Sequence, residues 1–181
     1  MRQSEVLMAT SALIPVSEYL RTSYRPDCDY VDGEVQERNL GEQDHSQIQT
    51  RLILLLGVLQ NEPYIWVNSE LRVQVKPDRF RVPDVCVRRA DAPSEQIVIT
   101  PPLLCIEVLS PEDQFARVRA RVRDYLEMGV LEVWVIDPET RTVSVSRGAE
   151  TVEHTAGELT VPSTPVVVRL EMIFRALDRT R

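Results

Sequence analysis

The sequence predicts a mixed α/β (α+β) domain in which helices pack on one mixed β-sheet. Segments with helical and with strand periodicity follow one another in the order helix, three strands, helix, strand and hairpin. The length of 181 residues suits one domain with its own hydrophobic core. No internal repeat, low-complexity tract or flexible linker divides the chain. We therefore expect a tail over residues 1–14 and one domain over residues 15–181.

The first predicted elements are a short helix, a bent extended segment and a core helix. The short helix covers Val16 to Arg21. Asp29 to Glu37 is expected to be extended and to bend at its Asp-Gly pair, which is a strong turn signal. The core helix runs to about Leu59, and its apolar residues recur at helical spacing. Its N-cap is expected to be Asp44 or Ser46.

Three strands are predicted to follow the core helix. Tyr64 to Val75 alternates apolar and polar residues toward its end and is typical of a half-buried strand. Pro83 to Arg88 is the second strand. Leu103 to Leu109 is almost entirely apolar, which favours a central position in the sheet.

A second helix and a smaller C-terminal group complete the predicted fold. The run Ser110-Pro111-Glu112-Asp113 combines a capping serine, a proline at the first helical position and acids in the first turn. Gly129 is expected to end this helix. The remaining predicted elements are the strand Glu132–Ile136, the edge strand Thr142–Ser146, the strand Val166–Leu170 and the short helix Glu171–Leu177.

Composition narrows the classes of function. The net charge of −7 argues against a general nucleic-acid binder, although it leaves room for a local basic patch. No run approaches the ~18 apolar residues that cross a bilayer, and the N-terminus does not resemble a signal peptide, so we expect a cytoplasmic protein with no membrane partner. Cys28, Cys86 and Cys105 lack the spacing of a disulfide framework or zinc site. Lys76 is the only lysine, which leaves few candidates for a catalytic lysine.

Glu107 stands in the middle of an apolar strand. An ionised, unpaired carboxylate there would cost several kcal/mol, so it needs a proton, a basic partner or a cation. If the second and third strands are antiparallel with Cys86 opposite Cys105, Asp84 lies opposite Glu107. A divalent cation would neutralise the two acids, and oxygen ligands without His or Cys favour Mg²⁺ or Mn²⁺.

The residues alone leave other interpretations of this pair open. Asp84 could be a turn residue at the start of a strand. Glu107 could be a core acid that is paired with an arginine. Cys86 and Cys105 are expected to be small core residues rather than ligands.

Several motifs stand in a fixed order along the chain. They are Asp32-Gly33-Glu34, His45 with Ile48 and Leu52, Pro83-Asp84-Val85, Glu107-Val108-Leu109-Ser110-Pro111, Tyr125 with Gly129-Val130, and Trp134-Val135-Ile136-Asp137-Pro138. With this set the sequence resembles the PD-(D/E)XK nuclease superfamily and, more narrowly, the bacterial Uma family of restriction-endonuclease-like proteins. The resemblance covers about residues 15–178.

The resemblance implies a restriction-endonuclease-like core of helix, three-stranded antiparallel meander, helix and strand, with the hairpin at the periphery. It also implies that Asp84 and Glu107 hold Mg²⁺ (or Mn²⁺) and that the substrate is a nucleic acid, with DNA expected. The superfamily's lysine would stand two residues after Glu107, where this chain has Leu109. In the Uma family the lysine looks to have moved to the next helix, at the position of Arg121. Arginine can bind a phosphate but is a poor general base.

Four further residues are candidates for the site. Glu34 could be an additional metal or water ligand, or a surface acid beside a turn. His45 could orient a phosphate or cap a helix. Arg117 and Arg119 could contact phosphates if their helix is exposed. The alternative for Arg121 is a solvated residue on this charged helix.

The sequence therefore leaves two candidate functions. The first is a Mg²⁺-dependent endonuclease that hydrolyses phosphodiester bonds in DNA. The second is a weakened or inactive nuclease-fold protein that binds nucleic acid or regulates, which the missing lysine and the acidic net charge favour. A homodimer is expected by analogy, because cutting both strands of a duplex calls for two sites.

Overall fold

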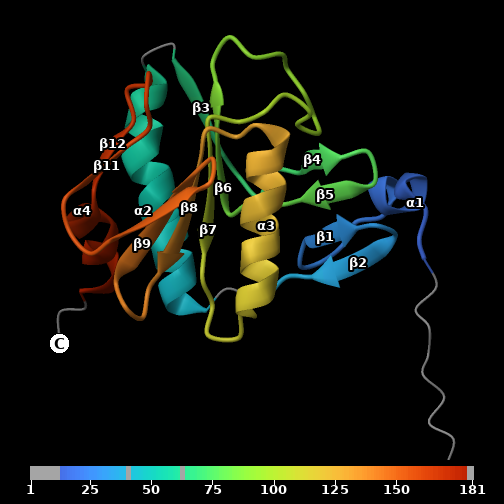
Figure 1. The fold of residues 1–181 in the computed structure, drawn as a ribbon, viewed down its shortest axis with the longest axis horizontal. Coiled ribbons are helices and arrows are strands. Elements are labelled where there is room, and N and C mark those ends of the chain that lie inside the picture. The colour runs from blue at the N-terminus through green and yellow to red at the C-terminus, as the bar shows by residue number, and fades with distance from the viewer. Residues whose placement is uncertain (1–12, 40–41, 62–63, 179–181) are drawn as a thin grey trace, which may run out of the picture.

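The computed structural model describes residues 13–39, 42–61 and 64–178. Its helices and strands are α1 Val16–Arg21, β1 Cys28–Val31, β2 Glu34–Glu37, α2 Gln43–Gly57, β3 Ile65–Ser69, β4 Val73–Lys76, β5 Arg79–Arg81, β6 Val85–Arg89, β7 Leu104–Val108, α3 Phe115–Met128, β8 Glu132–Asp137, β9 Thr142–Arg147, β10 Glu150–His154, β11 Glu158–Thr160, β12 Val167–Arg169 and α4 Leu170–Phe174. Short 3-10 turns follow α2 and α4 (Figure 1). No helix in the described ranges is long and apolar enough to span a membrane.

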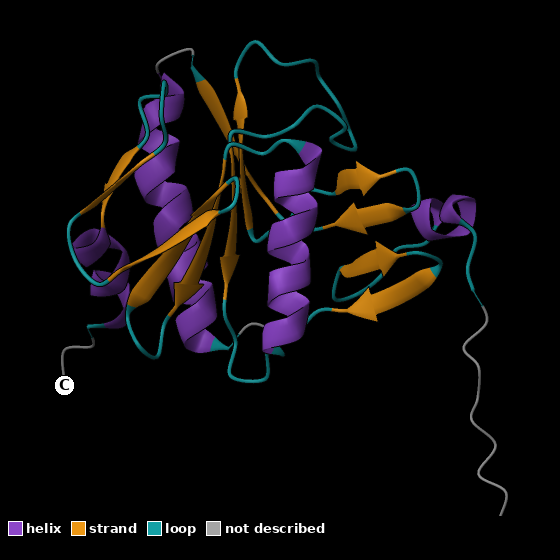
Figure 2. Ribbon diagram, viewed as in Figure 1, coloured by secondary structure: helices purple, strands orange, loops and turns teal. Residues whose placement is uncertain are grey.

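A six-stranded mixed sheet forms the centre of the molecule (Figure 2). Its strand order is β10-β9-β8-β7-β6-β3. Strands β7 and β8 are parallel and are joined through α3, while the other neighbours are antiparallel. The predicted mixed α+β class is therefore confirmed. The three predicted meander strands correspond to β3, β6 and β7, with β4 and β5 inserted between the first two.

Helices α2 and α3 cover opposite faces of this sheet. Successive side chains of a strand point to opposite faces, and the two hydrophobic clusters divide accordingly. Val85 and Ile106 pack in one cluster with Leu52 of α2. Cys86 and Cys105 pack in the other with residues of α3. Asp84 and Glu107 share the parity of these cysteines, so their side chains fall on the face that α3 covers.

The predicted register between β6 and β7 is confirmed. Cys86 lies directly opposite Cys105. Asp84 stands one residue before β6, and its Oδ2 accepts a hydrogen bond of 2.7 Å from the backbone N–H of Val108. The two acids therefore lie side by side at one end of their strands. Both cysteines are buried and free, as expected of core residues.

The expectation of one sheet is wrong, because a second sheet with the order β2-β1-β5-β4 lies beside the first, next to α1 (Figure 1). The predicted strand Tyr64–Val75 is divided between the two sheets as β3 and β4. The chain changes direction at Glu70, whose φ of 50° is incompatible with an extended strand. The predicted strand Val166–Leu170 corresponds to β12, but β5 and the partner strand β11 were not predicted from the sequence.

Three further expectations need correction. Neither Asp44 nor Ser46 caps α2, which begins at Gln43 after Glu42 without a side-chain cap. Strand β9 pairs with both β8 and β10, so it is not an edge strand. The third concerns the start of α3, which lies at Phe115 rather than just after Ser110.

A turn delays the start of α3. The backbone N–H of Ser110 donates to Oδ2 of Asp113 at 2.8 Å, and the N–H of Asp113 donates to the carbonyl of Ser110 at 2.9 Å. These two hydrogen bonds fold residues 110–113 into a turn. The segment that the sequence pattern assigned to the first helical turn therefore lies before α3. The predicted end at Gly129 is confirmed, and the glycine has the left-handed φ of 104° that favours this residue.

The predicted tail falls mainly on residues 1–12, which lie outside the described residues. Ile14 already packs with the second sheet, since its N–H donates to the carbonyl of Gly33 at 2.8 Å. The domain boundary at residue 15 stays a prediction.

Candidate functional site

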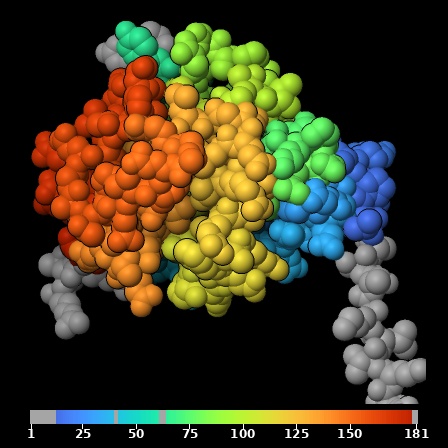
Figure 3. Space-filling view, viewed as in Figure 1, coloured from blue at the N-terminus to red at the C-terminus, as the bar shows by residue number. Residues whose placement is uncertain are grey.

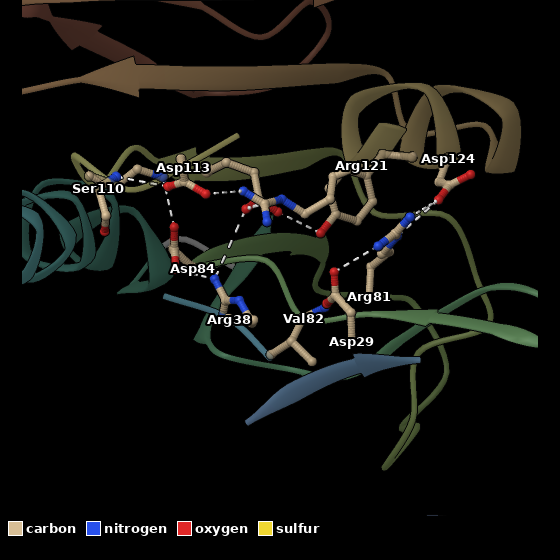
Figure 4. Close-up of polar contacts among 12 residues, drawn as sticks. Asp29, Arg38, Arg81, Val82, Asp84, Ser110, Asp113, Arg121 and Asp124 are labelled. Atoms are coloured by element: carbon tan, nitrogen blue, oxygen red, sulfur yellow. Dashed lines mark hydrogen bonds and ion pairs between the residues drawn. The ribbon is translucent and has the colours of Figure 1, made fainter. Parts of the chain in front are cut away.

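Four charged side chains from different parts of the fold meet on the α3 side of the central sheet. Asp84 precedes β6, Glu107 lies in β7, Arg121 comes from α3, and Arg38 follows β2. Figure 4 shows the side chains of Asp84, Arg38 and Arg121 close together. Asp84, Glu107 and Arg121 are 2%, 1% and 8% exposed. Such burial is costly for charged groups unless they are paired, so these contacts determine what the site can do.

Glu107 is held by one hydrogen bond and by ion pairs with Arg121 and, at a longer distance, Arg38. The hydroxyl of Tyr125 donates to its Oε1 at 2.7 Å. Its Oε2 lies 3.0 Å from Nε of Arg121, but the two atoms are not aligned as a hydrogen bond, so this buried oxygen has no hydrogen-bond partner. Burial raises the pKa of Glu107 to about 7; the charge of Arg121 opposes this rise and that of Asp84 adds to it. The carboxyl therefore titrates near neutral pH.

Asp84 has three partners. Arg38 forms an ion pair with its Oδ1. Nε2 of His45 lies 3.3 Å from Oδ2, which also accepts the Val108 N–H. Burial alone would raise the pKa of Asp84, but the charge of Arg38 and the contact with His45 lower it below its usual value. Asp84 is therefore ionised over the whole physiological range.

Arg38 belongs to the site although sequence reasoning did not find it. Its Nη2 pairs with Oδ1 of Asp84 and lies 4.0 Å from Oε2 of Glu107, so one guanidinium reaches both acids. Arg38 stands outside every motif that was recognised, at the end of a short strand. The sequence indicated only that a buried acid pair needs a basic partner. It did not indicate which arginine supplies it.

Arg121 points into the site, which excludes the alternative of a solvated surface residue. Its Nη2 lies 3.2 Å from Oδ1 of Asp113, so the turn before α3 also orients it. Burial disfavours the cation, but the surrounding acids, Glu107 foremost, outweigh burial and raise the pKa of Arg121 further above its usual range. The guanidinium is permanently charged.

The other predicted site residues divide into two groups. His45 lies in the site, and its contact with Asp84 raises its pKa despite the opposing effect of burial. Glu34 is exposed at the start of β2 and is not among the described residues that line the site. Lys76 forms an ion pair of 2.8 Å with Glu127 at the surface.

Arg117 and Arg119 are both exposed on α3 but face different ways. Arg117 lies one turn before Arg121 on the same side of the helix. Arg119 is offset by about 200° from Arg121 and stacks 4.9 Å from the ring centroid of Phe115. Figure 3 shows the surfaces of α3 and of the β9–β10 hairpin side by side, and Arg119 lines the groove between them rather than the acid pair.

An acidic cleft of about 520 Å³ adjoins the site. His45, Ser110 and Asp113 line both the cleft and the site. The acids that line the cleft are Glu42, Asp44, Asp113, Asp137, Glu139 and Glu153. A polyanion would be repelled there unless cations screened these charges.

The acid pair fits a divalent cation in the kind of ligand it offers. Two carboxylates are hard oxygen ligands, and Oε2 of Glu107 is a buried acceptor without a hydrogen bond. Within the described ranges, however, no group of three or more His, Cys, Asp or Glu side chains is placed to hold a metal ion. Arg38 reaches both carboxylates itself. Asp84 and Glu107 could therefore hold Mg²⁺ or Mn²⁺ once Arg38 has moved.

A mixed sheet with helices on both faces and an acid pair at the ends of antiparallel strands is the arrangement that the resemblance to restriction-endonuclease-like proteins implies. One solved structure, described as a putative nuclease belonging to DUF820 from Anabaena variabilis, matches this fold with a TM-score of 0.79 and 24% identity, over 89% of this chain and 97% of that one. The Uma2 family, described as "Putative restriction endonuclease", matches residues 16–177. The chain belongs to this family. None of the curated proteins matches it.

Tyr125→Phe tests the hydrogen bond that orients Glu107. Losing a buried hydroxyl that donates to a carboxyl group is expected to lower the free energy of unfolding by about 1–3 kcal/mol. Tyr64→Phe is the matched control, because Tyr64 is 58% exposed. Urea denaturation of both variants measures the difference in their free energies of unfolding. Equal values would show that the Tyr125–Glu107 hydrogen bond does not stabilise the fold.

Proposed function

We propose that this protein is a Mg²⁺-dependent (or Mn²⁺-dependent) endonuclease that hydrolyses phosphodiester bonds in DNA. The observation that carries the proposal is the meeting of Asp84 and Glu107 beside Arg121 in a chain of the Uma2 family. Nucleases of this kind act on a nucleic acid, and DNA is the substrate proposed here. A homodimer with two-fold symmetry would bring two such sites to a duplex.

The proposed roles follow from the contacts of each residue. Asp84 and Glu107 would hold the cation, which when bound can polarise the scissile phosphate and activate water. Tyr125 fixes the orientation of Glu107 through its 2.7 Å hydrogen bond. Arg121 offers a permanent charge and a planar set of donors to a phosphate oxygen, but it cannot readily accept a proton. Asp113 orients Arg121 from the preceding turn.

His45 and Arg117 are proposed to guide the substrate. His45 lies between the acid pair and the cleft, and its raised pKa increases the protonated fraction near neutral pH. An imidazolium could donate to a phosphate oxygen. Arg117, exposed one turn from Arg121, is the proposed contact with a neighbouring phosphate.

Cleavage of supercoiled plasmid DNA tests the proposal. The wild type should nick or linearise the plasmid in the presence of Mg²⁺ or Mn²⁺, and cleavage should stop when EDTA is added. Asp84→Asn should lose activity, whereas Asp91→Asn, a change of the same kind in an exposed surface pair, should retain it. Equal cleavage by the wild type and by Asp84→Asn would reject the assignment of this site.

A non-catalytic role is the second candidate, and one observation favours it. The guanidinium groups of Arg38 and Arg121 already neutralise the acid pair, and the single lysine of the chain pairs elsewhere with Glu127. Such a protein would keep the fold as a module that binds nucleic acid or regulates. It would bind DNA without cutting it in the plasmid assay.

Arg121→Lys separates the two candidates. Lysine can lose a proton more readily than arginine, and general acid–base catalysis contributes roughly 10²–10⁴-fold to a rate. We expect Arg121→Lys to cut at least about 10-fold faster than Arg121→Met, which has no charge. Strong cleavage by Arg121→Lys with a silent wild type would favour a site that has decayed. Equal rates for the two variants would remove Arg121 from the proposed mechanism.

A further inference from the structure

Arg38 contacts both members of the acid pair. It lies beyond the end of β2, and the ion pairs of its side chain join it to Asp84 and Glu107, from the ends of two other strands. Arg121, by contrast, is held by Asp113 as well as by Glu107. Arg38 is therefore the cation that bridges the two acids.

The charges of the site balance without a metal ion. Asp84 and Glu107 can carry two negative charges, and Arg38 and Arg121 carry two positive ones. A divalent cation that entered without any other change would leave an excess of positive charge in a buried space, where such an excess is costly. The cation and the Arg38 guanidinium would also need the same carboxylate oxygens.

We propose that Arg38 is an internal cation that holds the place of the divalent metal ion, and that metal binding exchanges with it. This inference rests on the proposed metal site at Asp84 and Glu107. In the metal-free protein Arg38, together with Arg121, balances the charge of the acid pair. When the metal ion binds, the Arg38 side chain swings out of the site, so a higher metal concentration is needed than the acid pair alone would require.

The surroundings of Arg38 provide space for this movement. Arg38 lines a cavity of about 290 Å³ whose described lining includes no residue of α3. Two further acids, Asp27 and Glu70, line the same cavity and could pair with the displaced guanidinium. Asp84 and His45, like Arg38, line both this cavity and the site, so the two spaces adjoin. Rotation of one side chain, without a change of fold, would exchange one set of acid partners for the other.

Calorimetric titration with Mn²⁺ tests the exchange directly and needs no activity. Arg38→Gln removes the competing charge, so we expect it to bind Mn²⁺ at least about tenfold more tightly than the wild type. Arg38→Lys keeps a charge but loses the planar fork that spans both acids, so its affinity should lie between the two. Arg89→Gln removes a charge from the surface pair with Asp91 and should bind like the wild type.

The outcomes separate this inference from the proposed function. Binding by the wild type that Asp84→Asn abolishes, but that Arg38→Gln leaves equal or weakens, would overturn the exchange and keep the metal site. Absence of saturable binding in the wild type and in both Arg38 variants would overturn both. If Arg38→Gln does not fold, as judged by circular dichroism, Arg38→Lys takes its place. Tighter Mn²⁺ binding by Arg38→Lys than by the wild type would support the exchange, and equal or weaker binding would overturn it.

Discussion

Replacing Glu107 by glutamine is expected to abolish cleavage and to stabilise the metal-free fold above neutral pH. Glutamine cannot supply the anionic ligand that the proposed metal ion needs, and even indirect partners of metal ligands are worth about 10–100-fold, so we expect a loss of more than about 100-fold. At the same time the raised pKa of Glu107, which already includes the attraction of Arg121 and Arg38, shows that its site favours a neutral side chain, and glutamine supplies one of similar shape. The variant should therefore lose function while its fold gains stability.

The pH dependence of this stabilisation has a definite sign. Burial raises the pKa of Glu107 from 4.5 to about 7, so the folded protein retains a proton that the unfolded chain releases. The wild type therefore loses stability as the pH rises from about 4.5 to about 7, by about 3 kcal/mol in total. The charged or titratable groups that act on Glu107 include Arg121, Asp84, Arg38 and Asp29, and Tyr125 donates a hydrogen bond to it.

Urea denaturation in EDTA at several pH values between 4.5 and 8 measures this effect, with Glu150→Gln at an exposed position as the control. The difference in unfolding free energy between Glu107→Gln and the wild type should grow over this interval and then level off. A difference that does not change with pH would mean that the native partners of Glu107 compensate its burial fully.

Asp124→Asn is expected to cause the largest loss of stability. Asp124 is fully buried on α3, and its carboxylate pairs with Arg81 at 2.6 Å and with Arg79 at 2.8 Å. Arg81 in turn pairs with the buried Asp29 of β1 at 2.8 Å (Figure 4). Removing one partner of a buried ion pair costs about 3–5 kcal/mol, because the remaining charges lose their compensation.

This network also holds the helix that carries Arg121. Asp124 ties α3 to the second sheet, and Arg121 lies one turn before it on the same helix. Thermal or chemical denaturation of Asp124→Asn measures the expected loss, and Asp91→Asn in an exposed ion pair should change little. Similar stabilities for these two variants would show that the buried network does not hold the second sheet against α3.

The acid pair could be predicted from the sequence because it follows from local periodicity. An antiparallel pairing that sets Cys86 opposite Cys105 fixes the position of Asp84 beside Glu107, and strand alternation fixes the face. The helical spacing of Arg121 and Tyr125 likewise predicts that both lie on one side of α3. These relations involve neighbouring strands or a single helix, so the spacing of the residues along the sequence is enough to predict them.

Residues whose role depends on long-range contacts could not be predicted in this way. Arg38 reaches Asp84 across 46 positions of sequence, and twenty arginine or lysine side chains besides it made equally plausible partners. Asp113 looked like a helix-start acid, but its carboxylate closes a turn with Ser110 instead. The break at Glu70 was hidden because residues typical of strands stand on both sides of it, although β3 and β4 belong to different sheets.

Titration of the wild type with Mn²⁺ beside Asp84→Asn, by calorimetry in matched buffers, tests most directly whether the acid pair is a metal site. We expect saturable binding by the wild type that is lost in Asp84→Asn while circular dichroism shows an intact fold. Binding that is equal in the two proteins, or absent from both, would contradict it and leave Glu107 as a buried acid paired with arginine.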